Sequence, residues 1–164
     1  MLINRLVTAL VIAAASTASA VGAVPAAWAT PTENYRDSGS DSFTTSKVCS
    51  DPIRVDSTWS IVIHTFYDAA GTATRLAFTG TTRISYTDLA NGNTYAPNSS
   101  GPGTINLSTG QTWVRGSNAA VFSNDGVLMS TSGRIIYSAD GSIISITGKQ
   151  RSVCAALGTG DYGG

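Results

Sequence analysis

The chain has few of the side chains on which catalytic sites are usually built. Among its 164 residues there is one histidine, His64, and a single glutamate, Glu33, and charged residues make up only 12%. A metal site with two or three histidines, or a histidine pair acting as acid and base, therefore cannot form within one chain. Paired catalytic carboxylates are also disfavoured, because most aspartates occur in turn sequences. We expect no metal and no other cofactor, and the shortage favours a non-enzymatic role.

Charge of neither sign is in excess, since Lys and Arg number ten and Asp and Glu also number ten. No basic run is present, so nucleic acid is not an expected partner. Arg54 and Asp56 lie two positions apart in a strand-like segment, which predicts a surface ion pair. His64 falls on the polar side of the same segment, which predicts a solvated histidine or one at the rim of the sheet.

Cysteine is nearly absent, and the two that occur, Cys49 and Cys154, enclose most of the patterned sequence. The N-terminus has the three parts of an export signal: one positive charge in residues 1–5, an uncharged run over 6–24, and the small-x-small sequence at 27–29. We expect cleavage after Ala29, a secreted product without a membrane span, and a disulfide between the two cysteines. A retained membrane anchor is the alternative. Closing a loop of roughly a hundred residues is worth about 4–5 kcal/mol on the chain-entropy model.

Composition divides the chain into four parts. Residues 1–29 form the expected signal peptide. Residues 30–42 are rich in Ser, Thr, Asp and Gly and are expected to be a flexible leader. Residues 43–157 form the expected domain, and residues 158–164 form a disordered tail. Oligomeric state is not readable from these features.

Period-two alternation dominates the domain. From Ile53 to Ile63 apolar and polar residues alternate, and a second alternating segment runs from Leu76 to Tyr86. Gly80 lies on the apolar side of that segment and suggests a bulge or a bend. Further strands are expected over 112–123, 127–138 and 142–151, with an interrupted strand over 94–107 and no helix.

Strands joined by short turns favour an antiparallel meander. The sequence therefore predicts an all-β fold, a single meander β-barrel of about 7–8 strands. A two-sheet β-sandwich is the alternative.

Aromatic side chains are the remaining source of a binding site, although they make up only 8% of the chain. Several recur at strand positions, where they would either line a barrel lumen around an apolar ligand or pack as an ordinary core. The candidate ligand-binding residues are Trp59, Phe78, Tyr86, Trp113 and Tyr137.

Several segments resemble small secreted β-barrel-like proteins of actinobacteria, a group of unknown function. The segments are the strand at 59–67, the turn F-Y-D-A-A-G at 66–71, the hairpin D-G-V-L-M-S-T-S-G-R-I-I-Y-S-A-D-G-S-I at 125–143, and C-A-A-L at 154–157. The resemblance implies secretion by an actinobacterium and a compact barrel-like domain. It supplies no catalytic residues.

Three functions are compatible with these features. The preferred one is a secreted non-enzymatic module that binds a small apolar ligand or a cell-envelope partner. The second is a barrel-type isomerase or cyclase similar to allene oxide cyclases, in which the shape of the lumen does much of the catalysis. The third is a purely structural envelope protein.

Overall fold

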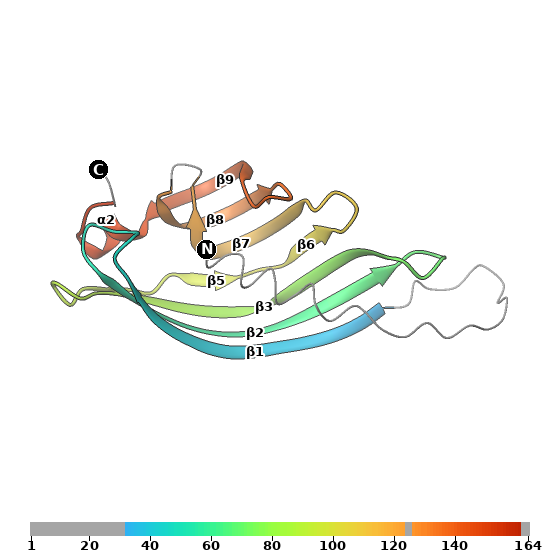
Figure 1. The fold of residues 1–164 in the computed structure, drawn as a ribbon, viewed down its shortest axis with the longest axis horizontal. Coiled ribbons are helices and arrows are strands. Elements are labelled where there is room, and N and C mark those ends of the chain that lie inside the picture. Colours follow the sequence, from blue (N-terminus) through green and yellow to red (C-terminus); the bar gives the residue numbers. More distant parts are fainter. Residues whose placement is uncertain (1–31, 124–125, 162–164) are drawn as a thin grey trace.

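A computed structural model describes residues 32–123 and 126–161 of the chain. These residues form nine strands and one short helix (Figure 1). The long strands are β1 (Thr32–Thr45), β2 (Ile53–Tyr67), β3 (Ala73–Asp88), β7 (Thr112–Phe122), β8 (Leu128–Tyr137) and β9 (Ile143–Ser152). The short elements are β4 (Thr94–Tyr95), β5 (Asn98–Ser100), β6 (Gly103–Asn106) and α2 (Val153–Leu157).

All the strands belong to one antiparallel sheet with the order β1-β2-β3-β5-β7-β8-β9. The short strands β4, β5 and β6 all pair with β3, and β5 and β6 also pair with β7. They are successive pieces of the interrupted strand expected over 94–107, where Pro97 and Pro102 remove ladder donors. The expected all-β, barrel-like meander is confirmed, and its strands form one sheet rather than the two of a sandwich.

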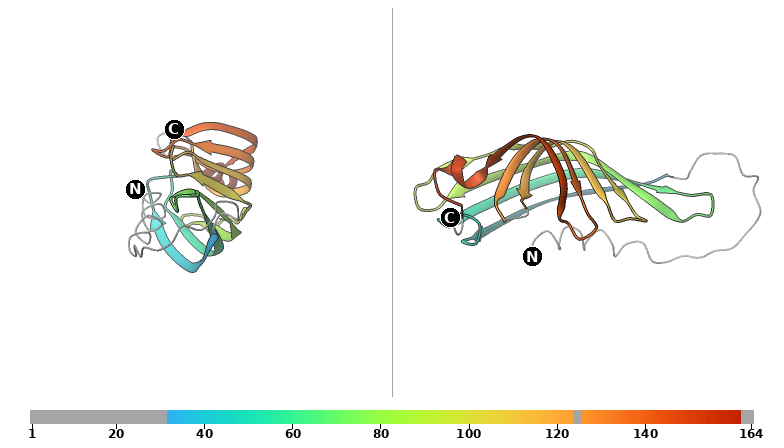
Figure 2. Two further views of the ribbon diagram at one scale, coloured as in Figure 1. Left: turned by 90° about the vertical axis from the view of Figure 1, so that its right-hand side faces the viewer. Right: turned by 90° about the horizontal axis from the view of Figure 1, so that it is seen from above.

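Glycines on neighbouring strands form a line across the sheet, which we call the glycine line: Gly80, Gly101, Gly116, Gly133 and Gly148. A Cβ atom added at any of them would lie 1.9–2.4 Å from a backbone oxygen of the adjacent strand. Because no side chain occupies this line, the strands can bend sharply there. Figure 2 shows β7, β8 and β9 arching so that the sheet curls over one of its faces.

The main core lies at the end of the molecule where α2 packs against the sheet (Figure 1). Val153, Cys154 and Leu157 of the helix are fully buried, in a cluster that includes Val55 and Tyr86. Ser152 caps the helix N-terminus through its side chain, and Gly158 ends the helix in the left-handed conformation. The helix therefore closes one end of the curled sheet.

The predicted disulfide is present and joins this helix to the loop after β1. The Cα atoms of Cys49 and Cys154 are 5.4 Å apart, and both residues are fully buried. The cross-link therefore ties the connection between β1 and β2 to the C-terminal helix, across the whole length of the patterned sequence.

The prediction of a flexible leader over residues 30–42 is wrong from Thr32 onward. That part of the leader is most of β1, which pairs with β2 along its full length, from Thr32 opposite Phe66 to Thr45 opposite Ile53. The strand lies at the edge of the sheet and is largely exposed. Its backbone groups form their hydrogen bonds with β2, so the strand forms without a continuous apolar face. The signal-peptide prediction for 1–29 falls outside the described residues.

Two expectations at the C-terminus also need correction. The helix α2 is not expected from the sequence, because a segment of five residues is too short to show helical periodicity. Residues 158–161 of the expected disordered tail are held in place: the backbone N–H of Ser50 donates to Gly160 O at 2.8 Å, and Ser152 Oγ donates to Asp161 Oδ1 at 2.9 Å. Residues 162–164 lie outside the described part.

Candidate functional site: the concave face

One face of the sheet carries an uninterrupted row of mainly apolar residues. Directly opposed residues of an antiparallel pair lie on the same face, so the ladder registers define the row strand by strand. Its members, from β1 to β9, are Tyr35, Ile63, Phe78, Gly103, Val114, Ile135 and Ile146. We call this the apolar row.

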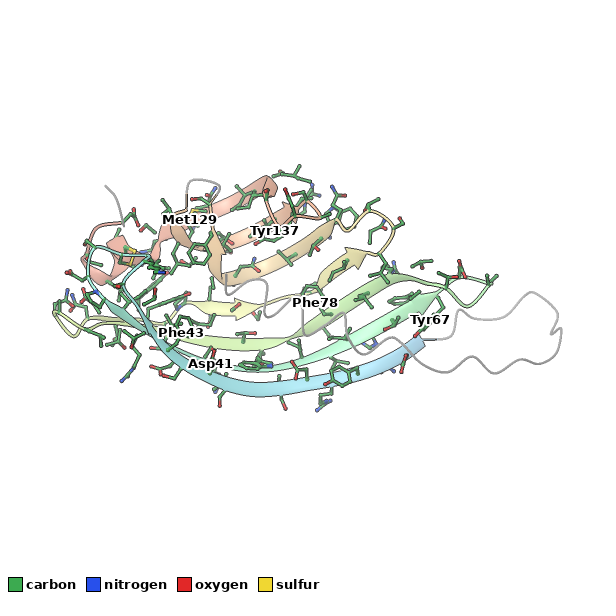
Figure 3. The ribbon with its side chains drawn as sticks, viewed as in Figure 1. Asp41, Phe43, Tyr67, Phe78, Met129 and Tyr137 are labelled. Atoms are coloured by element: carbon green, nitrogen blue, oxygen red, sulfur yellow. A yellow bond between two sulfur atoms is a disulfide. The ribbon has the colours of Figure 1, made fainter. Side chains whose placement is uncertain are left out.

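The sheet curls over the apolar row, which makes this face concave. Ile135 is fully buried and Ile63 is 6% exposed. At the β1 edge, by contrast, Tyr35 is 61% exposed. Figure 3 labels Phe78 on β3 and Tyr137 on β8, which lie on opposite sides of the curl. The row therefore has a buried floor and an exposed rim.

The glycine line divides the concave face into two halves. On one side, Val55 and Tyr86 belong to the main core together with the buried residues of α2, and Phe43 packs against it. On the other side lie the apolar row and a parallel row that contains Leu76, Ile105 and Tyr137. Among the described residues no helix lies over this second half, whose side chains are mostly half-buried.

The structure brings three of the five predicted aromatic residues onto the accessible part of the concave face. Trp59, Phe78 and Tyr137 are half-buried there. Tyr86 shares the face but is 1% exposed, and its hydroxyl donates to Ala119 O at 2.7 Å. Trp113 follows the opposite alternation to Val114 and therefore lies on the other face. The five aromatic residues do not form one site.

Two of these rings cover glycines of neighbouring strands. A Cβ atom on Gly103 would lie 2.0 Å from the ring of Phe78, and one on Gly39 would lie 2.6 Å from the ring of Trp59. The indole N–H of Trp59 donates to Asp37 Oδ2 at 2.9 Å. Both rings thus fill space left by a missing side chain, as aromatic residues do opposite glycine in sheets. They build the floor of the concave face while part of each ring stays accessible.

Polar groups lie at the rim of this face. The Tyr67 hydroxyl donates to Glu33 Oε2 at 2.8 Å, and this bond raises the pKa of Tyr67. Burial raises the pKa of Tyr137. Tyr137 is therefore neutral at physiological pH and its hydroxyl can donate a hydrogen bond next to an apolar surface, whereas the proton of the Tyr67 hydroxyl is already used in the bond to Glu33.

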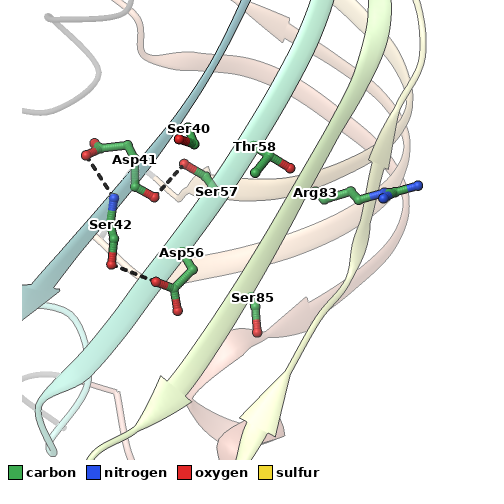
Figure 4. Close-up of a pocket in the computed structure, with 8 residues that line it drawn as sticks. All are labelled: Ser40, Asp41, Ser42, Asp56, Ser57, Thr58, Arg83 and Ser85. Atoms are coloured by element: carbon green, nitrogen blue, oxygen red, sulfur yellow. Dashed lines mark hydrogen bonds between the residues drawn. The ribbon is translucent and has the colours of Figure 1, made fainter.

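A hollow lies on the opposite, convex face, over β1, β2 and β3 (Figure 4). It is open, has a volume of about 510 Å³ and is lined by Ser40, Asp41, Ser42, Asp56, Ser57, Thr58, Arg83 and Ser85. Ser42 Oγ donates to Asp56 Oδ1 at 2.6 Å and, with the weaker effect of Arg54, lowers the pKa of Asp56. The predicted Arg54–Asp56 ion pair is confirmed at 2.9 Å. Asp56 is therefore ionised at neutral pH and is unsuited to act as a general acid there.

Other catalytic arrangements find little support in the described residues. His64 lies on the convex face, half-buried, with Nδ1 against Asn34 Oδ1. Within residues 32–123 and 126–161 no three His, Cys, Asp or Glu side chains gather as a metal site would require. No helix of that part is long and apolar enough to cross a membrane.

Sequence reasoning missed several residues of the concave face, among them Tyr35, Leu76, Ile105 and Ile135. Tyr35 was assigned to the leader. The others lie in segments expected to be strands, but their membership of one surface depends on how the strands are aligned, which the pattern of a single strand does not report. No protein-family model matches the chain, and no curated protein or solved structure matches it either.

Proposed function

We propose that the protein is a secreted, non-enzymatic binding module that holds an elongated apolar molecule, such as an acyl chain, on its concave face. The observation that supports this most strongly is the apolar row, which crosses the sheet from β1 to β9. Its floor is buried while its rim is exposed, as in sites that enclose most of an apolar ligand. A flat apolar face of this length would be an aggregation hazard, and curling the sheet shields it.

The ends of the concave face differ in a way that suits such a ligand. The α2 helix and the disulfide close one end, so an extended molecule would enter from the end where Tyr67 and Glu33 pair. The neutral Tyr137 hydroxyl would donate to a polar head group near that end, while the apolar chain lies over Leu76 and Ile105. Secretion is proposed from the signal-like N-terminus together with the disulfide, which persists in oxidising compartments.

The test is a fluorescence titration with a polyene fatty acid, using purified protein and two matched variants. Ile105→Glu places a charge on the concave face, whereas Ile144→Glu makes the same change at a residue that is 56% exposed. Losing the burial of one aliphatic side chain against a ligand costs about 1.5–3 kcal/mol, so Ile105→Glu should weaken binding by roughly tenfold or more. Ile144→Glu should leave binding unchanged.

Circular dichroism and urea unfolding establish that both variants are folded before they are compared. Absence of saturable binding by the folded wild-type protein would contradict the proposal. So would a concave face occupied by a second copy, which sedimentation would reveal as a dimer that Ile105→Glu converts to monomer.

A further inference from the structure

The charged residues are segregated between the two faces of the sheet, which the balanced net charge conceals. On the concave side, β1 carries Glu33, Asp37 and Asp41. The alternation that places the apolar row on the concave face places most of the cations on the convex face. They are Arg36, Arg54, Arg75, Arg83, Arg115, Arg134 and Lys149, and all of them are exposed. We call this surface the basic face.

Few of these cations are neutralised. Asp56 is the carboxylate that shares the basic face within the described strands, and it is paired with Arg54. Arg75 lies over the ring of Phe66, 4.0 Å from its centroid. For Arg115, Arg134 and Lys149, no carboxylate of the described residues lies within ion-pair distance.

Arg115 and Arg134 are directly opposed on β7 and β8. Like charges in directly opposed positions destabilise a sheet, so this pair costs folding free energy in the isolated protein. An anion bound between the two guanidinium groups would remove the repulsion, because Arg binds phosphate in a bidentate manner. The pair is therefore the strongest individual indication that the basic face meets an anionic partner.

The residues around this pair also suit a phosphate-rich surface. A row of hydroxyl residues crosses the whole sheet on the same face and ends at Lys149: Ser38, Ser60, Thr81, Ser100, Ser117 and Ser132. Trp113 and Ile136 are directly opposed next to the arginine pair, and both are half-buried. Tryptophan beside basic residues is typical of surfaces that sit at the level of lipid head groups.

We propose that the basic face docks on a bilayer that contains anionic phospholipids. The cations are distributed over all the long strands rather than along a groove, so they match a two-dimensional array of phosphates better than a single polymer strand. Docking in this way leaves the concave face accessible. The inference goes beyond the proposed ligand binding and does not depend on it.

The test is co-sedimentation of the protein with vesicles of phosphatidylglycerol and phosphatidylcholine, compared with vesicles of phosphatidylcholine alone. Each Lys or Arg near an anionic surface contributes about a fivefold gain in partitioning. The double variant Arg115→Gln/Arg134→Gln should therefore bind the anionic vesicles roughly 25-fold more weakly. Lys47→Gln removes one positive charge from the exposed loop after β1 and should change binding by less than about twofold.

Raising the salt concentration should release the wild-type protein, because exposed charges are screened within a Debye length of about 8 Å at physiological ionic strength. Equal binding to neutral vesicles would overturn the proposal, since it would indicate apolar insertion. Equal losses in the double variant and Lys47→Gln would also overturn it. Binding to soluble polyphosphate without binding to anionic vesicles would replace the bilayer by a linear polyanion. The same variants are also titrated with the polyene fatty acid. Unchanged fatty-acid binding would show that their loss of vesicle binding is separate from ligand binding on the concave face.

Discussion

The glycine line makes a strong prediction about stability at Gly133. This residue lies in β8, between β7 and β9, with φ of 154°. In Gly133→Ala the new Cβ atom would lie 1.9 Å from Thr147 O, whereas a carbon and an oxygen ordinarily approach to about 3.3–3.6 Å. The backbone of β9 would have to move away, disturbing the ladder on one side of β8.

The expected loss of stability follows from two contributions. A non-glycine residue held at this backbone conformation costs about 1–3 kcal/mol. Each ladder hydrogen bond that is broken or left without a partner costs about a further 1 kcal/mol or more. With one such bond lost, Gly133→Ala should therefore lower the free energy of unfolding by about 2–4 kcal/mol, measured by urea denaturation followed by circular dichroism.

Gly71→Ala is the matched control. Gly71 also has a positive φ, 80°, but an added Cβ atom would meet nothing within 4 Å. This substitution should cost only the conformational contribution, about 1–2 kcal/mol. If the two variants lose the same stability, then the close approach of strands at the glycine line does not contribute, and our explanation of the bend is wrong.

Two further predictions concern the main core. Replacing Cys49 and Cys154 together by alanine should lower the free energy of unfolding by about 4–5 kcal/mol, because the disulfide closes a loop with a sequence separation of 105 residues. Urea denaturation of the variant and of the oxidised wild type measures this loss, and a loss below about 1 kcal/mol would contradict the chain-entropy account. Tyr86→Phe should lower the free energy of unfolding by about 1–3 kcal/mol in the same assay, since it leaves the carbonyl of Ala119 without its buried donor. An unchanged urea midpoint would show that this hydrogen bond adds no stability.

Much of the fold was predictable because its signals are local. Alternation from Ile53 to Ile63 marked β2, the prolines marked the interrupted strand, and Gly80 marked a position on the bend. The disulfide followed from the presence of two cysteines behind an export-like N-terminus. The error at β1 has the same origin, because an edge strand with Glu33, Asp37 and Asp41 on its inner side carries no apolar alternation to recognise.

The candidate site was less predictable because it depends on register. Trp59 and Trp113 both appeared as aromatic residues within strands, yet they lie on opposite faces. Nothing within a few residues of either one reports the face on which it lies, because that depends on how its strand is aligned with the neighbouring strands.

By itself the sequence determined the all-β class, most of the strands and the cysteine pair, since turn chemistry and period-two alternation act over a few residues. Only the tertiary structure decided which residues share a surface. The ladder aligns glycines from distant segments into one line, gathers the apolar row beneath the curl, and separates the cations from the acids of β1. These alignments join residues far apart in the chain, and a shift of one position in any strand would exchange its two faces.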